Sequence, residues 1–150
     1  MMPTSAAWIT TDSSPSFVVG YQSQQLSIFD ASTGLEKSTL SFNPDPHKSL
    51  LQQQINKLEV SEQHNLAISG HEDNSIKFYD LGSGKCINSI IGHTDSVSAL
   101  QATPSKLVSG GHDGSIRAWD MRTFTRIFDQ AAHRKKYDEG VQCLAYNELF

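Results

Sequence analysis

The chain has 150 residues, of which 37% are hydrophobic and 19% charged, a balance typical of a globular domain with an apolar core. Its 12 basic and 16 acidic residues give a net charge of −4, which argues against a nucleic-acid binder that neutralises many phosphates. The two cysteines, Cys86 and Cys143, are too few for a disulfide scaffold or a cysteine-based zinc site, so we expect a reducing compartment. Neither a membrane-spanning run nor a signal peptide is expected.

A repeat runs through the sequence, built from three kinds of β-type run in a fixed order. The first kind spaces its apolar residues in the same way each time, at 55–60, 97–102 and 141–146. The second kind ends in glycine, at 17–20, 66–70 and 107–110. The third kind closes on aspartate, at 26–30, 75–80 and 115–120. With a fourth run in each unit, repeats that start 42 and 44 residues apart are typical of the blades of a β-propeller.

The repeat predicts an all-β fold, a partial β-propeller of about three four-stranded antiparallel blades plus the first strand of a fourth. In chain order, we expect blade 1 at residues 4–42, a surface insertion at 43–54, blade 2 at 55–91, blade 3 at 97–131 and the start of blade 4 at 141–150. The best candidate for a helical turn, residues 48–57, overlaps the insertion. Asn74 and Gly114 predict tight hairpin turns within blades 2 and 3, because both residue types tolerate positive φ.

The third unit resembles the WD-repeat family. It carries four dipeptides of that family at the family's spacing: Gly92-His93, Ser109-Gly110, Asp113-Gly114 and Trp119-Asp120. The second unit is a weaker copy, with Tyr79 in place of tryptophan. The first is weaker still, with Phe29 at that position and Gln24 where the aspartate would stand.

The resemblance implies a buried hydrogen-bonded tetrad of His93, Ser109, Asp113 and Trp119. Such a network satisfies both imidazole nitrogens and gives the indole N–H an acceptor. A serine, a histidine and an aspartate also suggest a hydrolase, but no Gly-x-Ser-x-Gly elbow is present. We therefore expect a structural tetrad, no enzyme activity and no cofactor.

Six histidines raise the possibility of a metal site, but no His-x-x-x-His or Cys-x-x-Cys pair occurs in the sequence. His71 and His112 are interpreted as equivalent residues of the repeat, each placed just before a turn aspartate. Residues 81–85 end in Gly-Lys but lack the earlier glycine of a P-loop, so we expect a turn between two strands of blade 2.

The loop ahead of the fourth blade is the candidate site for binding a partner, through Arg134, Lys135, Lys136 and Tyr137. It is longer than its counterpart before blade 3 and carries three consecutive cations. A solvated loop is the alternative, because charge runs of this length are common. An acidic or amphipathic partner protein is the functional interpretation.

Residues 133–141 resemble the loop before the last blade of the striatins, and residues 69–80 resemble one of their earlier blades. This resemblance implies a non-enzymatic scaffold that assembles protein phosphatase 2A subunits, Ste20-like kinases and a Mob-like adaptor. It also implies a cytoplasmic location, in part on the face of internal membranes, with no direct insertion into them. The alternative is a WD-repeat adaptor of another complex, such as a ubiquitin-ligase substrate receptor or a trafficking assembly.

Three sets of four strands plus one further strand make about half a propeller, so we interpret the chain as a fragment or a partial gene model. Half a propeller is expected to leave blade faces uncovered. Ile28, Phe78, Ile116 and Val141 are the residues expected on these uncovered faces. The coiled coil of the striatins has no counterpart in these 150 residues.

Overall fold

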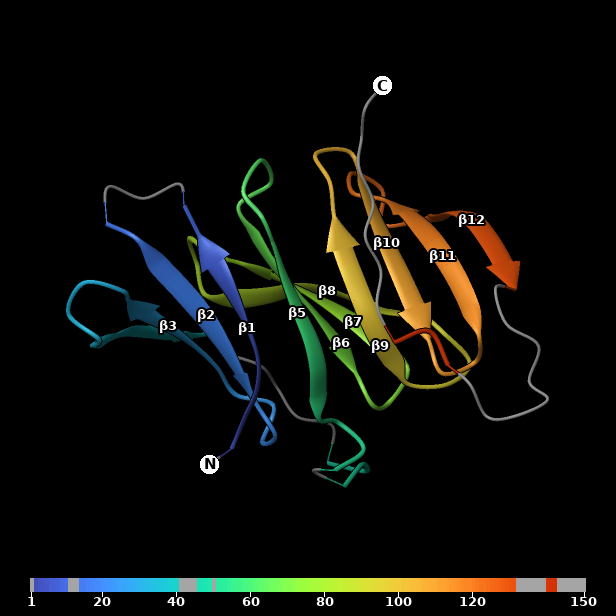
Figure 1. Ribbon diagram of the computed structural model, residues 1–150, viewed down its shortest axis with the longest axis horizontal. Coiled ribbons are helices and arrows are strands. Elements are labelled where there is room, and N and C mark those ends of the chain that lie inside the picture. The colour runs from blue at the N-terminus through green and yellow to red at the C-terminus, as the bar shows by residue number, and fades with distance from the viewer. Residues whose placement is uncertain (1, 11–13, 41–45, 50, 132–139, 143–150) are drawn as a thin grey trace.

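A computed structural model describes residues 2–10, 14–40, 46–49, 51–131 and 140–142, which form three four-stranded antiparallel sheets (Figure 1). Blade 1 contains β1 (Pro3–Ile9), β2 (Ser16–Tyr21), β3 (Leu26–Asp30) and β4 (Glu36–Leu40). Blade 2 contains β5 (Ile55–Ser61), β6 (Leu66–His71), β7 (Ser75–Asp80) and β8 (Lys85–Ile91). Blade 3 contains β9 (Val97–Ala102), β10 (Lys106–Gly111), β11 (Ser115–Asp120) and β12 (Arg126–Ala131). The all-β prediction is confirmed.

The strands of each blade pair in chain order, and the three sheets stand side by side as an open fan (Figure 1). The first strands of the blades, β1, β5 and β9, contact one another along the inner edge of the fan. The last strands, β4, β8 and β12, lie on the outside, and every residue of β12 is exposed. Among the described residues, no helix is long and apolar enough to cross a membrane.

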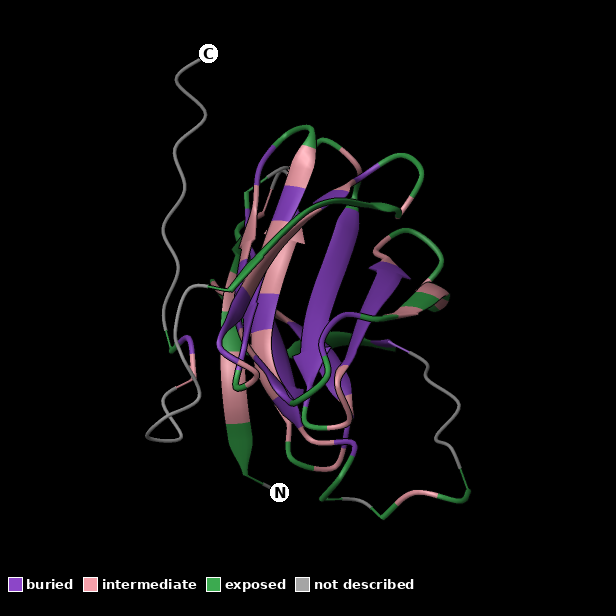
Figure 2. Cartoon of the chain, turned by 90° about the vertical axis from the view of Figure 1, so that its right-hand side faces the viewer, coloured by how far each residue is buried: buried purple, intermediate pink, exposed green. Residues whose placement is uncertain are grey.

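Two apolar cores lie between the blades, and the most buried strands fill the middle of the fan (Figure 2). One face of blade 1 packs on blade 2 through residues such as Ile28 and Leu58. The opposite face of blade 2 packs on blade 3, where Phe78 and Trp119 share a core. The middle strands of blade 2, β6 and β7, are therefore covered on both sides, which explains why nearly all their residues are buried.

The expectation that four apolar residues lie on uncovered faces is wrong for three of them. Ile28, Phe78 and Val141 are 7%, 0% and 5% exposed, because each faces a neighbouring part of the described chain. Only Ile116 is partly open. The uncovered face of blade 1 instead carries Trp8, which is 64% exposed and stacks edge-on against Phe17.

The hairpin turns follow the sequence prediction in blades 2 and 3. Asn74 and Gly114 adopt φ of 71° and 75°. The matching position in blade 1 is Gln24, with φ of 69°. In blades 2 and 3 the turn aspartate directly precedes the positive-φ residue, so its counterpart in blade 1 is Ser23. This is one residue earlier than predicted, because the first repeat has no sequence marker that fixes the register of the turn.

All three blades share two β-bulges at equivalent positions. The bulge on the first strand holds a polar residue: Thr4, Asn56 and Ser98. The Asn56 side chain donates to the backbone oxygen of Val97 at 3.2 Å, and the Ser98 hydroxyl donates to the backbone oxygen of Val141. The bulges of blades 2 and 3 therefore link these blades to Val97 and Val141, whereas Thr4 donates to the Gly20 backbone oxygen within blade 1. Re-aiming a side chain is a common role of bulges.

The insertion between blades 1 and 2 is not wholly a surface feature. The described residues at 46–49 and 51–54 form turns rather than a helix. Gln53 is only 1% exposed, and its side-chain amide donates to the Lys48 backbone oxygen at 3.0 Å. The end of the insertion is thus part of the blade 2 core, because the buried strand β6 takes a hydrogen-bond partner from it.

Replacing Gly70 with alanine is expected to destabilise the contact between blades 2 and 3. A β-carbon at Gly70 would lie 2.6 Å from Cγ1 of Val97, which overpacks a buried interface. The expected loss is about 1–3 kcal/mol of unfolding free energy, measured by chemical denaturation. Gly82→Ala is the matched control, since its nearest neighbour would be 3.5 Å away. Equal stability of the two variants would show that Val97 gives way freely.

Candidate functional site

Blade 3 brings the four predicted tetrad residues into one hydrogen-bonded chain. The Trp119 indole N–H donates to Ser109 Oγ at 2.8 Å, and Ser109 Oγ lies 2.8 Å from Nε2 of His93. Nδ1 of His93 lies 3.1 Å from both carboxylate oxygens of Asp113. Because the carboxylate can only accept, Nδ1 carries the proton and Nε2 accepts the Ser109 hydroxyl.

Asp113 anchors this chain at its outer end. Its carboxylate accepts from the backbone N–H of Thr94 at 3.0 Å and of Ser115 at 3.0 Å. Although burial acts to raise the pKa of Asp113, hydrogen bonds from Ser115 and Thr94 hold it well below its usual range. Burial lowers the pKa of His93, against the opposing effect of Asp113. The pair is thus an ionised carboxylate and a neutral imidazole.

The order Asp113, His93, Ser109 is that of a hydrolytic triad, but its surroundings prevent such chemistry. Ser109 is fully buried and its oxygen already accepts the Trp119 N–H. A nucleophile needs access to substrate and a nearby site for the oxyanion. This hydroxyl lacks access, so the geometry fits a role in joining β10 and β11 to the segment before β9.

Blade 2 builds a similar network from a different histidine. Nε2 of His71 lies 2.7 Å from Ser69 Oγ, and Nδ1 lies 2.8 Å from the backbone oxygen of Gln53. Since a carbonyl can only accept, His71 has the same tautomer as His93 and accepts from the serine at the equivalent position. Asp73, the counterpart of Asp113, instead pairs with Lys48 at 2.9 Å.

The interpretation of His71 and His112 as equivalent residues is wrong. Strand pairing opposes His71 to Ile55 and Gly111 to Val97, so His71 corresponds to Gly111. A β-carbon at Gly111 would lie 2.6 Å from Nδ1 of His93. The two histidines therefore fill the same space, His71 from β6 and His93 from the connection before β9. His112 lies outside this space, with Nδ1 2.7 Å from Ser96 Oγ.

Blade 1 has no equivalent network among the described residues. The serine position is Val19 and the tryptophan position is Phe29, as the strand register shows. Phe29 stacks on Phe17, with ring centroids 5.6 Å apart. The Ser23 hydroxyl and the Gln24 carboxamide are buried there without a hydrogen-bond partner. Hydrogen bonding around the serine position therefore increases from blade 1 to blade 3.

The predicted partner loop, Arg134, Lys135, Lys136 and Tyr137, lies outside the described residues. Nearby, Gly140 and Val141 are described, and the Val141 backbone N–H donates to Gly111 at 3.0 Å. This contact attaches the end of the loop to blade 3. Within the described part of the chain, no group of three His, Cys, Asp or Glu side chains is arranged to hold a metal ion.

Comparison with known proteins agrees with this geometry. The family model "WD domain, G-beta repeat" matches residues 84–120, which end at the tetrad tryptophan and its aspartate. The chain is 35% identical to the striatin homolog of Dictyostelium discoideum and to mouse striatin, in each case over 97% of its length. The chain is a WD-repeat homologue of the striatins. It spans only 18% and 19% of the lengths of these two relatives.

Solved structures support the propeller fold of this striatin homologue. The computationally designed Ika4 protein matches with a TM-score of 0.77 and 23% identity, over 98% of this chain and 81% of that one. The U3-55K structure matches with a TM-score of 0.75 and 18% identity, over 94% of this chain and 41% of that one. At these identities the likeness concerns the fold alone, and it confirms the partial β-propeller.

The striatin homologue is expected to lose stability as the pH falls from 6.5 towards 4. Burial lowers the pKa of His71 from 6.5 to about 4, so over this range the unfolded chain binds the proton that the folded chain excludes. Unfolding free energy therefore falls with pH, by on the order of 2–3 kcal/mol from His71 if the whole shift is realised. Denaturant titrations at several pH values measure this slope.

The matched variants for this measurement are His71→Gln and His47→Gln. The first removes the buried imidazole and should flatten the slope, whereas the second changes an exposed residue and should leave it intact. The same slope in His71→Gln as in the parent would contradict the assignment.

Proposed function

We propose that this chain is part of a non-enzymatic scaffold of the striatin type, which binds proteins within an assembly of protein phosphatase 2A and Ste20-like kinases. The observation that carries the proposal is the 35% identity to striatins along nearly the whole chain. This similarity reaches well beyond the generic WD match at residues 84–120. It supports a protein-binding role, and the named partners, a Mob-like adaptor included, follow from the resemblance.

The chemistry of the described residues fits a scaffold better than an enzyme. The histidines His71 and His93 bond to the buried serines Ser69 and Ser109 and to a backbone oxygen or a carboxylate. Groups used in this way hold strands together and are not free to react. A cytoplasmic location, on the face of internal membranes through partners, belongs to the same proposal.

The loop that contains Arg134, Lys135, Lys136 and Tyr137 is the proposed contact with an acidic partner. Three adjacent cations between blade 3 and Val141 would speed association with a negatively charged surface. Exposed charges contribute little to folding, so the loop can be tested without loss of the blades.

Affinity purification of the full-length gene product tests the proposal. Phosphatase 2A scaffold and catalytic subunits and a Ste20-like kinase should be recovered. Changing Arg134, Lys135 and Lys136 together to Glu should slow association with the acidic partner and weaken its salt dependence, while thermal unfolding stays nearly unchanged. Lys85→Glu, an exposed charge change on blade 2, is the control.

Recovery of a different assembly, such as a ubiquitin ligase or a coat complex, would contradict the scaffold assignment. If changing the three cations to Glu left the association rate unchanged at every ionic strength, the proposed role of the loop would be wrong. The scaffold assignment would not be affected by that result.

A further inference from the structure

The outer side of blade 1 is an open sheet face with an aromatic centre. Blade 1 stands at one end of the fan, so no blade precedes it among the described residues (Figure 1). Strand register places Trp8 of β1 opposite Phe17 of β2, and Phe17 opposite Phe29 of β3. Trp8 is 64% exposed, and the two phenylalanines are half-buried. Neighbouring ring centroids lie 5.7 Å and 5.6 Å apart, so the three rings form one continuous patch, the aromatic face.

The same side of blades 2 and 3 is covered by the blade before it. In blade 2 the residues that correspond to Phe17 and Phe29 are Ala67 and Tyr79, which are fully buried against blade 1. In blade 3 they are Leu107 and Trp119, which are buried against blade 2. This side of a blade therefore packs on a second sheet wherever the described chain supplies one. An apolar patch of this kind that stays exposed marks an interaction surface.

The aromatic face is nearly free of charge. The strands of blade 1 contain three charged residues, Asp30, Glu36 and Lys37. Lys37 Nζ lies 3.5 Å from Asp30 Oδ2, so these two charges are paired. Glu36 lies on the outer strand β4, where its carboxylate accepts from Thr39 Oγ1 at 2.8 Å. Two copies of this face can therefore meet without like charges at the centre, and an apolar core with a polar rim is typical of homodimer interfaces.

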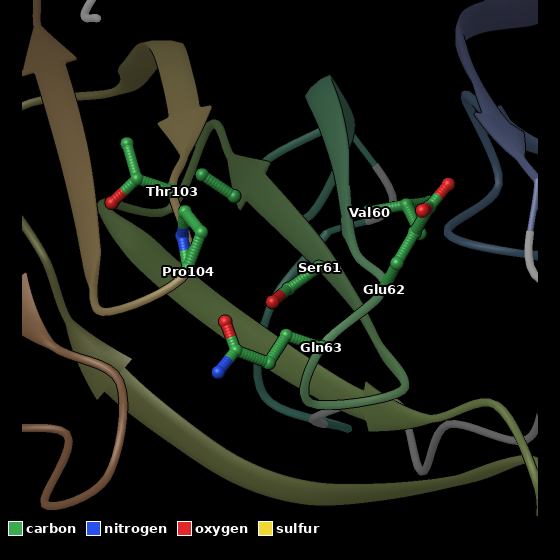
Figure 3. A pocket seen from close by; sticks show the side chains of 7 residues that line it. Val60, Ser61, Glu62, Gln63, Thr103 and Pro104 are labelled. Carbon is green, nitrogen blue, oxygen red and sulfur yellow. The ribbon is translucent and has the colours of Figure 1, made fainter. Parts of the chain in front are cut away.

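A hollow lies beside the exposed indole ring. Its volume is about 170 Å³, and it is lined by Ala6, Ala7, Trp8 and Phe17. A cavity of roughly 150 Å³ is large enough to hold a benzene ring, so one aromatic ring fits this hollow. The larger cavity between blades 2 and 3 has a different chemistry, because Glu62 and Gln63 line it (Figure 3). A projecting ring and a hollow that accepts a ring thus lie side by side on the aromatic face.

A second copy of the chain cannot stack on blade 3 in the way that blade 2 stacks on blade 1. Within the chain, the first strand of each following blade lies against the blade before it, β5 on blade 1 and β9 on blade 2. On blade 3 the corresponding position already holds Val141. Its backbone oxygen accepts from Ser98, as the oxygen of Val97 accepts from Asn56. A copy in that position would put its β1 where residues 140–142 lie.

We propose that the aromatic face pairs with the same face of a second copy of this chain, across a two-fold axis. The Trp8 ring of each copy enters the hollow of the other, so one contact is made twice. Interfaces on a two-fold axis are self-complementary in this way, and aromatic residues are enriched at interface centres. The inference goes beyond the proposed scaffold function and does not depend on it, because the dimer carries each partner-binding surface twice whichever partners bind.

Sedimentation velocity of the 150-residue chain over a dilution series tests the pairing. The chain should reach a dimer and stop, because a two-fold interface leaves no aromatic face free. As the dimer forms, the emission of Trp8 should move to shorter wavelength and acrylamide should quench it less. Trp119 is only 6% exposed, so its emission should change little.

Trp8→Glu should raise the dissociation constant of the dimer at least about hundredfold, since each dimer loses two aromatic anchors and gains two like charges. Because Trp8 is exposed on the single chain, the dilute variant should melt at the temperature of the dilute parent. Phe128→Glu is the matched control, because Phe128 is 48% exposed on β12 of blade 3. The same change there should leave the dissociation constant unaltered.

Several results would overturn the proposal. A chain that stays monomeric at every concentration would show that the aromatic face does not pair. Assemblies that grow beyond the dimer, or a dimer that is lost in Phe128→Glu, would show head-to-tail contact instead. A dimer that is unchanged by Trp8→Glu would place the contact elsewhere. A monomeric full-length gene product that is destabilised by Trp8→Glu would show that another segment of the same polypeptide covers the face.

Discussion

The structure depends on a buried imidazole in each of blades 2 and 3, and both nitrogens of each ring must be satisfied. In blade 3 the ring of His93 joins Ser109 on β10 to Asp113 in the following turn. In blade 2 the ring of His71 joins Ser69 to the backbone of the insertion. An unsatisfied imidazole in these positions would cost more than the hydrogen bonds gain, so each ring specifies where its neighbouring segments lie.

The two networks reach one arrangement from two sequence positions. His93 enters from the connection before blade 3, and Gly111 leaves room for it. His71 enters from β6 itself, and Leu51, the counterpart of His93, is 67% exposed. Blades 2 and 3 therefore share the buried site of the imidazole and its protonation at Nδ1, although the histidine comes from a different position of the repeat. Both networks commit interior polar groups to hydrogen bonds within the fold, so these groups are not available to bind a partner.

The sequence predicted the strands and the turn residues because period-two patterns and positive-φ residues act locally. It failed at Gln24, where a degenerate repeat offered no marker to set the register within one residue. It also failed at His71, because its equivalence to Gly111 appears only in the pairing with Ile55. The cavity where the β5–β6 turn meets the β9–β10 turn, between Gln63 and Pro104, could not be predicted either. Neither turn has a distinctive motif, and only the packing of blades 2 and 3 brings them together.

A double-mutant cycle on His93 and Gly111 tests most directly whether one imidazole space governs each blade. Gly111→His alone should strongly destabilise the chain, because the new ring would overlap the ring of His93. In a His93→Leu background, which copies blade 2, the same change should restore stability, with a coupling energy of at least about 1 kcal/mol in unfolding measurements. Strictly additive effects of the two substitutions would contradict the account.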